Sequence, residues 1–382
     1  MHFAFSEDQE LLRDTTRRFL RERHPVAAVR KSLEEPDAFD RDVWRAGAEL
    51  GWTALLVPDR DGGGSVTNQP IVDLAALAEE FGRELYPGPV LATNVVADLL
   101  AREGTAAQRE RLLRPIARGD TTAAWCLTAD GTIELEAVDV TLTELDAQGC
   151  ARLHGVARFV PGAHVADLLL VSAWGASGIS LVVVPLPVEG VGVRVMSGID
   201  LSRRICEVRF DEVVVSESAV VGAVGGAEAA IGRALQLATV VQAAEMVGAG
   251  EALFERTVQY AKDREQFGRP IGSFQALKHR LADMLIELEG ARAAARYAAF
   301  AMADERDDRG EAVAVAGSYV RDAIAHLCGE SLQLHGGIGF TWEHDVHLYL
   351  RRAKAEQVAY GEPWWHRERL CALTEAMVPE RV

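Results

Sequence analysis

The chain is poor in the residues that build disulfide frameworks and zinc sites. It has five widely spaced cysteines: Cys126, Cys150, Cys206, Cys328 and Cys371. Because their number is odd and no Cys-x-x-Cys pair occurs, the pattern excludes a disulfide scaffold and is typical of reduced thiols in a cytoplasm. His344 and His347 share a helical spacing, but no third ligand stands at metal spacing, so we expect no metal.

Positive charge and uninterrupted apolar sequence are also scarce. With 40 basic and 57 acidic residues the formal net charge is −17, which argues against nucleic-acid binding as the main role. The first eight residues have neither a basic region nor an apolar core, so we expect no secretory signal and a cytoplasmic location. The longest apolar stretch, residues 234–254, contains Glu245 and Glu251, which predicts a buried bundle helix and no membrane span.

What the chain does have is helical spacing at both ends. Ser6 and Gln9 predict a capping box at the first helix, which His24-Pro25 ends. Apolar periodicity predicts further N-terminal helices over 42–50, 71–81, 90–101 and 106–118. A C-terminal bundle is predicted from helices over about 227–263, 273–304, 310–335, 344–358 and 364–377.

Between these helical regions the pattern is that of strands. Alternating apolar runs predict strands over 152–160, 168–172, 179–184, 191–196 and 205–210. No helical segment separates them, so we expect an antiparallel β-barrel or sandwich. The apolar alternation that begins at Ile133 reverses its phase at Val138, which predicts a bulge in a strand pair or a turn between two strands.

The predicted fold class is therefore α+β, with an N-terminal helical domain (1–120), a β domain (121–224) and a C-terminal helical bundle (225–382). Glycines at Gly248 and Gly250 lie inside a predicted helix and follow no strand, so they do not form a dinucleotide fingerprint. We interpret them as sites where two helices pack closely.

Two segments of the bundle carry ligand-binding chemistry. In Arg264-x-x-Phe267-Gly268, at a helix end, a guanidinium stands beside an aromatic ring and can pair bidentately with phosphate. Gln275 follows eleven residues after the arginine. In Gln333-x-x-Gly336-Gly337, an amide precedes glycines that let backbone N–H groups approach a ligand closely.

Together with Phe5-Ser6-Glu7 and Trp125-Cys126-Leu127-Thr128, these motifs make nearly the whole chain resemble the acyl-CoA dehydrogenase family. The resemblance implies FAD, an acyl-CoA substrate, an electron-transfer flavoprotein or similar acceptor, and an oligomer. It also implies that a set of residues holds the adenine and pyrophosphate end of a flavin bound mainly by a neighbouring subunit: Arg264, Phe267, Gln275, Gln333, Gly336 and Gly337. Thr128, at the end of the strand that meets the flavin, is the candidate at the ring.

At the reaction end the chain departs from the family. The family removes the α-proton of the thioester with a carboxylate while the β-hydrogen leaves as hydride. The usual base position holds Tyr360, and a second position used by a minority of the family holds Ala238. A tyrosine would need a pKa about three units lower, or about 4 kcal/mol of phenolate stabilisation. For the nearest carboxylates, Glu362 and Glu245, we expect structural roles, and Glu362 is kept as an alternative base.

The flavin face also differs, since Thr128-Ala129-Asp130-Gly131 replaces the family's Thr-Glu-Pro-Gly, and Pro161 has no N–H to offer the ring. The chain is similar to base-lacking subunits of heteromeric bacterial acyl-CoA dehydrogenases, which act on bulky substrates such as steroid side chains. The alternative is a self-sufficient homo-oligomer that uses Tyr360 or Glu362 as its base. For Trp364 and Trp365 we favour a subunit interface over an acyl cavity.

Overall fold

The computed structural model describes residues 4–33, 35 and 39–377; the first three residues of the segment inspected for a signal lie outside this range. The N-terminal helices are α1 (Glu7–Arg23), α2 (Val26–Ser32), α3 (Arg41–Glu49), α4 (Pro70–Arg83), α5 (Val90–Glu103) and α6 (Ala106–Ala117). The predicted capping box is confirmed, because Ser6 and Gln9 exchange side chain-to-backbone hydrogen bonds. Helix α2 was not predicted: Pro25 ends one helix but also stands at the N-cap of the next.

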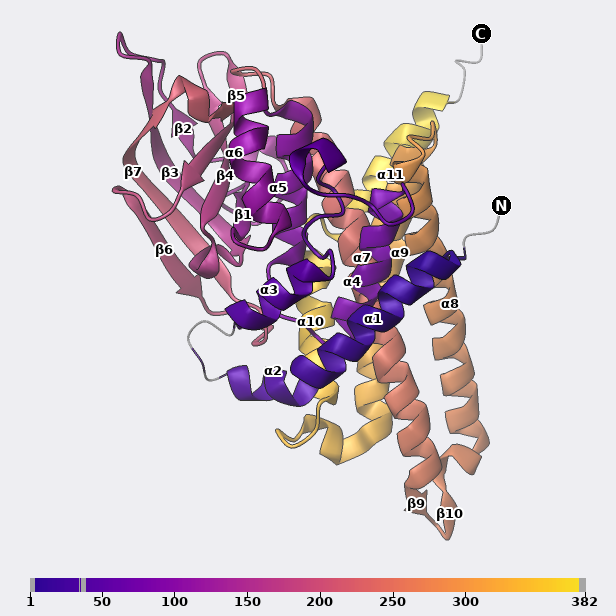
Figure 1. Ribbon diagram of the computed structural model, residues 1–382. Helices are drawn as coiled ribbons and strands as arrows, with labels where there is room; N and C mark the ends of the chain where they lie inside the picture. Colours follow the sequence, from indigo (N-terminus) through magenta and orange to yellow (C-terminus); the bar gives the residue numbers. More distant parts are fainter. Residues whose placement is uncertain (1–3, 34, 36–38, 378–382) are drawn as a thin grey trace, which may run out of the picture.

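The central strands form one sheet (Figure 1). They are β1 (Ala123–Cys126), β2 (Thr141–Leu142), β3 (Cys150–Pro161), β4 (Leu168–Gly175), β5 (Gly178–Pro185), β6 (Val191–Met196), β7 (Ile205–Ser216) and β8 (Val220–Val221). Their order is β6-β7-β3-β2-β4-β5-β8, with β1 paired to β4. Most pairs are antiparallel as expected, but β1 and β2 run parallel to β4, because no hairpin joins either of them to that strand.

Of the two alternatives for the phase reversal at Val138, the bulge was wrong and the turn between two strands is confirmed, although the run from Ile133 to Ala137 before it is not a strand. Residues 135–137 form a short 3-10 turn and only Thr141–Leu142 pair as a strand. Ile133 and Val138 are buried in the core shared by the helices, whereas Val140 and Leu142 are buried in the separate core of the sheet. The alternation changes phase because the chain passes from one core to the other.

The C-terminal helices are α7 (Glu228–Asp263), α8 (Gln275–Ala303), α9 (Arg309–His335), α10 (Val346–Val358) and α11 (Pro363–Met377). A small hairpin, β9 (Glu265–Gln266) and β10 (Arg269–Pro270), joins α7 to α8 at the end of the bundle away from the sheet (Figure 1). Short 3-10 turns complete the described elements: Asp59–Asp61, Leu135–Ala137, Ala163–Val165, Glu217–Ala219, Ile271–Ser273 and Gly336–Phe340. The predicted fold class is confirmed, while the exact domain limits stay predictions.

Helix α7 is the centre of this architecture. Among the described residues it is the one helix long and apolar enough to cross a membrane, but 89% of its apolar window is buried inside the protein. A Cβ on Gly248 would lie 1.7 Å from the carbonyl oxygen of Glu79 on α4. The interpretation of this glycine as a close-packing site is thereby confirmed, and α4 and α7 pack with their backbones in near contact.

Candidate functional site

A cavity of about 410 Å³ lies between the sheet and the turn that joins α10 to α11. Its walls are largely aromatic and apolar and include Trp125, Leu127, Ile133, Phe159, Trp364 and Trp365. The two neighbouring tryptophans of α11 thus line a cavity, which was the less favoured of their two sequence interpretations. A neighbouring cavity of about 480 Å³ shares Ile133 and Trp365 with this one, and its charged lining is mixed: Arg233, Arg309, Arg369, Glu134, Glu136 and Glu228.

Phe159 reaches the first cavity because strand β3 is irregular there. The pairing of β3 with β7 shifts register between Ala157 and Val160, and Phe159 takes a positive φ of 57°. A bulged residue of this kind is unpaired and re-aims its side chain, so the ring is directed into the cavity. Gly131, with a φ of 87°, accommodates it, since a Cβ at this position would lie 2.9 Å from the phenylalanine ring.

Tyr360 also lines this cavity, and hydrogen bonds from His366 and Arg321 to backbone carbonyls hold the turn on which it lies. Its φ is 53°, and its carbonyl accepts a hydrogen bond of 3.2 Å from Nε2–H of His366, whose pKa burial lowers to about 3. Arg321, fully buried, donates at 3.0 Å to the carbonyl of Ala359. Burial raises the pKa of Tyr360 to about 12, so only about one phenol in 10⁵ is ionised at pH 7.

The other residues predicted near the flavin ring and the base are Glu362, Ala238 and Thr128. Glu362 lines the same cavity, is exposed, and accepts a hydrogen bond from Trp364 Nε1. Ala238 is fully buried in the helical core. Thr128 is buried at the cavity, and its hydroxyl donates at 2.6 Å to the carbonyl of Thr132, which uses its only proton within the loop. Glu362 is thus the one carboxylate of the two sequence candidates that faces the cavity.

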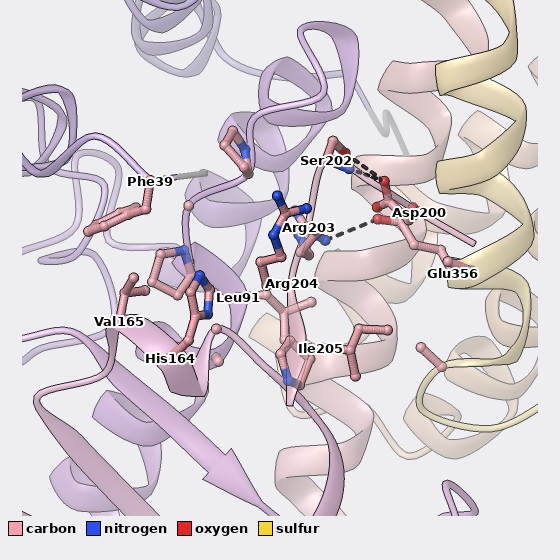
Figure 2. A pocket seen from close by; sticks show the side chains of 18 of the residues that line it. Phe39, Leu91, His164, Val165, Asp200, Ser202, Arg203, Arg204, Ile205 and Glu356 are labelled. Atoms are coloured by element: carbon pink, nitrogen blue, oxygen red, sulfur yellow. Dashed lines mark hydrogen bonds and ion pairs between the residues drawn. The ribbon is translucent and has the colours of Figure 1, made fainter. Parts of the chain in front are cut away.

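A second, much smaller cavity of about 70 Å³ continues from the first, since Pro161, Ile205, Ala355, Ala359 and Tyr360 line both. Figure 2 shows its lining, in which Asp200, Ser202, Arg203 and Glu356 gather at one side. Whereas the first cavity is mainly apolar, this one ends in buried charges.

These charges form a network of ion pairs with α7 and α10. Arg203 contacts Glu245 Oε1 at 2.6 Å and Glu356 Oε1 at 3.2 Å. Arg352 contacts Asp200 Oδ2 at 2.5 Å and Glu245 Oε1 at 2.8 Å. The structural interpretation of Glu245 is confirmed. The other four residues were missed, because contacts between residues 42 to 153 positions apart leave no spacing pattern in the sequence.

The six residues predicted at the flavin tail lie together at the opposite end of the bundle. The side chains of Arg264, Phe267, Gln275 and Gln333 are exposed, as are Gly336 and Gly337, and Phe267 reaches 91% exposure. The ring of Tyr260 stacks on His335 with centroids 4.4 Å apart, which joins the end of α7 to the end of α9. The structure therefore brings the Arg264 segment and the Gln333 segment to one surface.

This surface is far from the cavities. Gln242 of α7 lines the small cavity, and Arg264 stands 22 residues further along the same helix. At 1.5 Å per residue the two are about 33 Å apart. A single dinucleotide ligand cannot contact both places on one chain.

Family models of known proteins match two parts of the chain. "Acyl-CoA dehydrogenase, N-terminal domain" matches residues 6–120 and "Acyl-CoA dehydrogenase, C-terminal domain" matches residues 221–371. The chain is 29% identical to the acyl-CoA dehydrogenase IpdE2 of Mycobacterium tuberculosis, over 91% of each chain. It is 34% identical to the acyl-CoA dehydrogenase FadE34 of the same species, over 99% of this chain and 49% of that protein.

Two solved structures are similar in both sequence and fold. One is a variant of the Tcur3481-Tcur3483 steroid ACAD, with 28% identity, a TM-score of 0.86 and coverage of 97% of this chain and 98% of the other. The other is the ChsE4-ChsE5 complex from Mycobacterium tuberculosis, with 26% identity, a TM-score of 0.87 and coverage of 99% and 100%.

Proposed function

The chain belongs to the acyl-CoA dehydrogenase family, whose cofactor is FAD, and from this premise we propose that it is the base-lacking partner chain of a heteromeric acyl-CoA dehydrogenase. In this role it completes a flavin site whose reactive face and catalytic base belong to a second acyl-CoA dehydrogenase chain. The assembly carries out α,β-dehydrogenation of an acyl-CoA thioester in the cytoplasm, with an electron-transfer flavoprotein or similar acceptor.

The residues at the far end of the bundle fit the tail of FAD. Arg264 offers an exposed guanidinium for a phosphate, and Gln333 offers an amide. Gly336, with a φ of 62° and open space where a Cβ would stand, leaves the backbone accessible at the end of α9. This surface has the donors that a nucleotide diphosphate requires, and none of its members is buried within its own chain.

The ring end fits less well. The larger cavity has aromatic walls, but Pro161 lacks an N–H and the proton of Thr128 is already donated to Thr132. When bound, FAD accepts the hydride that leaves the β-carbon of the thioester. Removal of the α-proton needs a base, and Tyr360, a neutral phenol with a pKa of about 12, does not supply one.

The observation that carries the proposal is the neutral phenol of Tyr360, with a pKa of about 12, where the family places its base; the distance of about 33 Å between Gln242 at the small cavity and Arg264 at the tail surface adds that the flavin is shared with a neighbour. Because one flavin cannot span it, the tail residues of this chain serve a flavin whose ring lies in a neighbour. A chain that keeps this surface but lacks a competent base suits a partner role. Support by likeness comes from the ChsE4-ChsE5 complex and from the steroid ACAD.

The experiment compares the chain purified alone with the chain co-expressed with a base-bearing acyl-CoA dehydrogenase from the same source. Flavin content is read from visible absorbance, and turnover from an acyl-CoA series with a dye acceptor. We expect turnover only in the co-expressed complex. Flavin-loaded chain that turns over acyl-CoA by itself would contradict the proposal.

One observation favours the self-sufficient alternative: Glu362 presents its carboxylate in the larger cavity. If it were the base, Glu362→Gln would lower the rate about 10²–10⁴-fold. Glu134→Gln is a matched control, because Glu134 accepts a hydrogen bond from Trp365 Nε1 just as Glu362 does from Trp364 Nε1. Under the partner proposal both variants leave turnover of the complex unchanged.

A further inference from the structure

The space beyond Tyr360, into which an acyl group would have to extend, is small. In this family the base position lies at the α-carbon of the thioester, so the acyl chain extends past it. Here the larger cavity of about 410 Å³ continues, past five shared lining residues that include Tyr360, into a remainder of only about 70 Å³. Pockets for organic ligands are typically about 300–1,000 Å³, so the remainder is too small for a bulky acyl group.

Arg203 spans this remainder. It comes from the loop that precedes β7, and its guanidinium donates to Glu245 of α7, to Glu356 of α10 and, at 3.2 Å, to the carbonyl of Tyr86. Figure 2 shows its side chain reaching from the loop toward Glu356 on the yellow helix. It therefore ties the sheet to both helical regions across the space in question.

A second layer fixes the carboxylates that hold Arg203. Arg352 is fully buried and donates to Asp200, Glu245 and, at 2.6 Å, Ser202 Oγ. The network has two cations against three carboxyl groups, and burial, with Glu245 nearby, raises the pKa of Glu356 to about 8. At neutral pH the charges balance, so an entering apolar chain would have to displace a neutral set of ion pairs, in which only Oε2 of Glu356 has no hydrogen-bond partner.

We infer that Arg203 is a specificity-determining residue that closes the acyl end of this chain's own cavity. The inference rests on the proposed function for the position of the thioester. Beyond that function, the inference says that the space past Tyr360 in this chain admits no acyl chain. The acyl group of the reaction is then held by the partner chain.

The test measures binding of saturated acyl-CoA thioesters, from butyryl- to dodecanoyl-CoA, to the full chain by calorimetry. In the unmodified chain the dissociation constant should change by no more than about twofold across the series. In Arg203→Ala/Glu245→Gln, which removes one cation and one carboxylate together, each newly buried methylene should tighten binding about fourfold. A steady tightening already in the unmodified chain would overturn the inference.

A matched control is Arg13→Ala/Glu79→Gln, which removes another buried pair, 2.8 Å apart, that lines neither cavity. Its dissociation constants should change by no more than about twofold across the acyl-CoA series, which we call a flat series, as in the unmodified chain. Arg203→Val/Glu245→Gln keeps an apolar contact beside the loop, leaves most of the length of the arginine side chain empty, and serves if the first variant does not fold. A folded variant with a flat series would show that Arg203 is not the closing residue.

Failure of this inference is distinguishable from failure of the proposed function. A chain that turns over acyl-CoA alone but shows a flat series refutes the partner role and leaves the closure intact. A chain that is inactive alone but binds long acyl groups more tightly than short ones refutes the closure by Arg203 and leaves the partner role intact.

Discussion

Arg352→Met is expected to destabilise the protein far more than loss of a surface ion pair. Arg352 is 1% exposed and donates to Asp200 at 2.5 Å and to Glu245 at 2.8 Å. Its removal leaves three buried carboxyl groups facing the single cation of Arg203. Breaking a buried pair from one side costs about 3–5 kcal/mol of unfolding free energy.

This loss converts into a measurable shift of the melting midpoint. An unfolding entropy of about 2.1 cal/mol/K per residue gives about 0.8 kcal/mol/K for 382 residues. The midpoint in calorimetry should therefore fall by about 4–6 °C. Arg352→Met/Asp200→Asn removes the excess negative charge and should recover about 2 kcal/mol or more of the loss.

The pH dependence gives an independent check. Burial alone would raise the pKa of Asp200, but Arg352, Ser202 and Arg203 hold it below its usual value. A depressed carboxyl pKa contributes stability that is present above about pH 4 and is lost as the pH falls through the folded-state value. The cost of Arg352→Met should thus shrink below about pH 4. A midpoint shift under about 1 °C, or a cost that does not change with pH, would refute the reasoning.

Three further outcomes follow from the described contacts. Tyr360→Phe should leave turnover of the heteromer within about twofold, since a neutral phenol removes no proton; a loss of about 10²-fold or more would make Tyr360 the base. Arg264→Gln should weaken flavin retention by the complex about 10–100-fold, measured by ultrafiltration, whereas Arg269→Gln in the adjoining hairpin should not. Gly248→Ala should cost about 2 kcal/mol or more in denaturant unfolding, because its Cβ would lie 1.7 Å from a carbonyl oxygen; Gly250→Ala should cost less, since its nearest atom, at 2.7 Å, belongs to a flexible isoleucine side chain.

Much of the fold was readable from the sequence because its signals are local. The Ser6–Gln9 capping box, the helical spacing of apolar residues and the alternation in the strands each depend on a few neighbouring positions. For the same reason, the Arg264 and Gln333 motifs could be proposed as a flavin site, and Tyr360 as the occupant of the base position, before any contact was known; these assignments stay predictions. Between Ile133 and Leu142 the apolar residues belong to two different cores, so the bulge predicted from their spacing was wrong.

The sequence by itself thus determined the fold class and the family resemblance, and it supplied the hypothesis that Tyr360 and Ala238 replace the usual base. Only the tertiary structure decided that Arg203 and Glu356 meet across 153 positions, that the phenol of Tyr360 is held neutral, and that Gln242, about 33 Å from Arg264 along α7, lines the small cavity. Ion pairing and desolvation depend on every group that surrounds a side chain in space. Those neighbours come from distant parts of the chain, so no spacing along it records them.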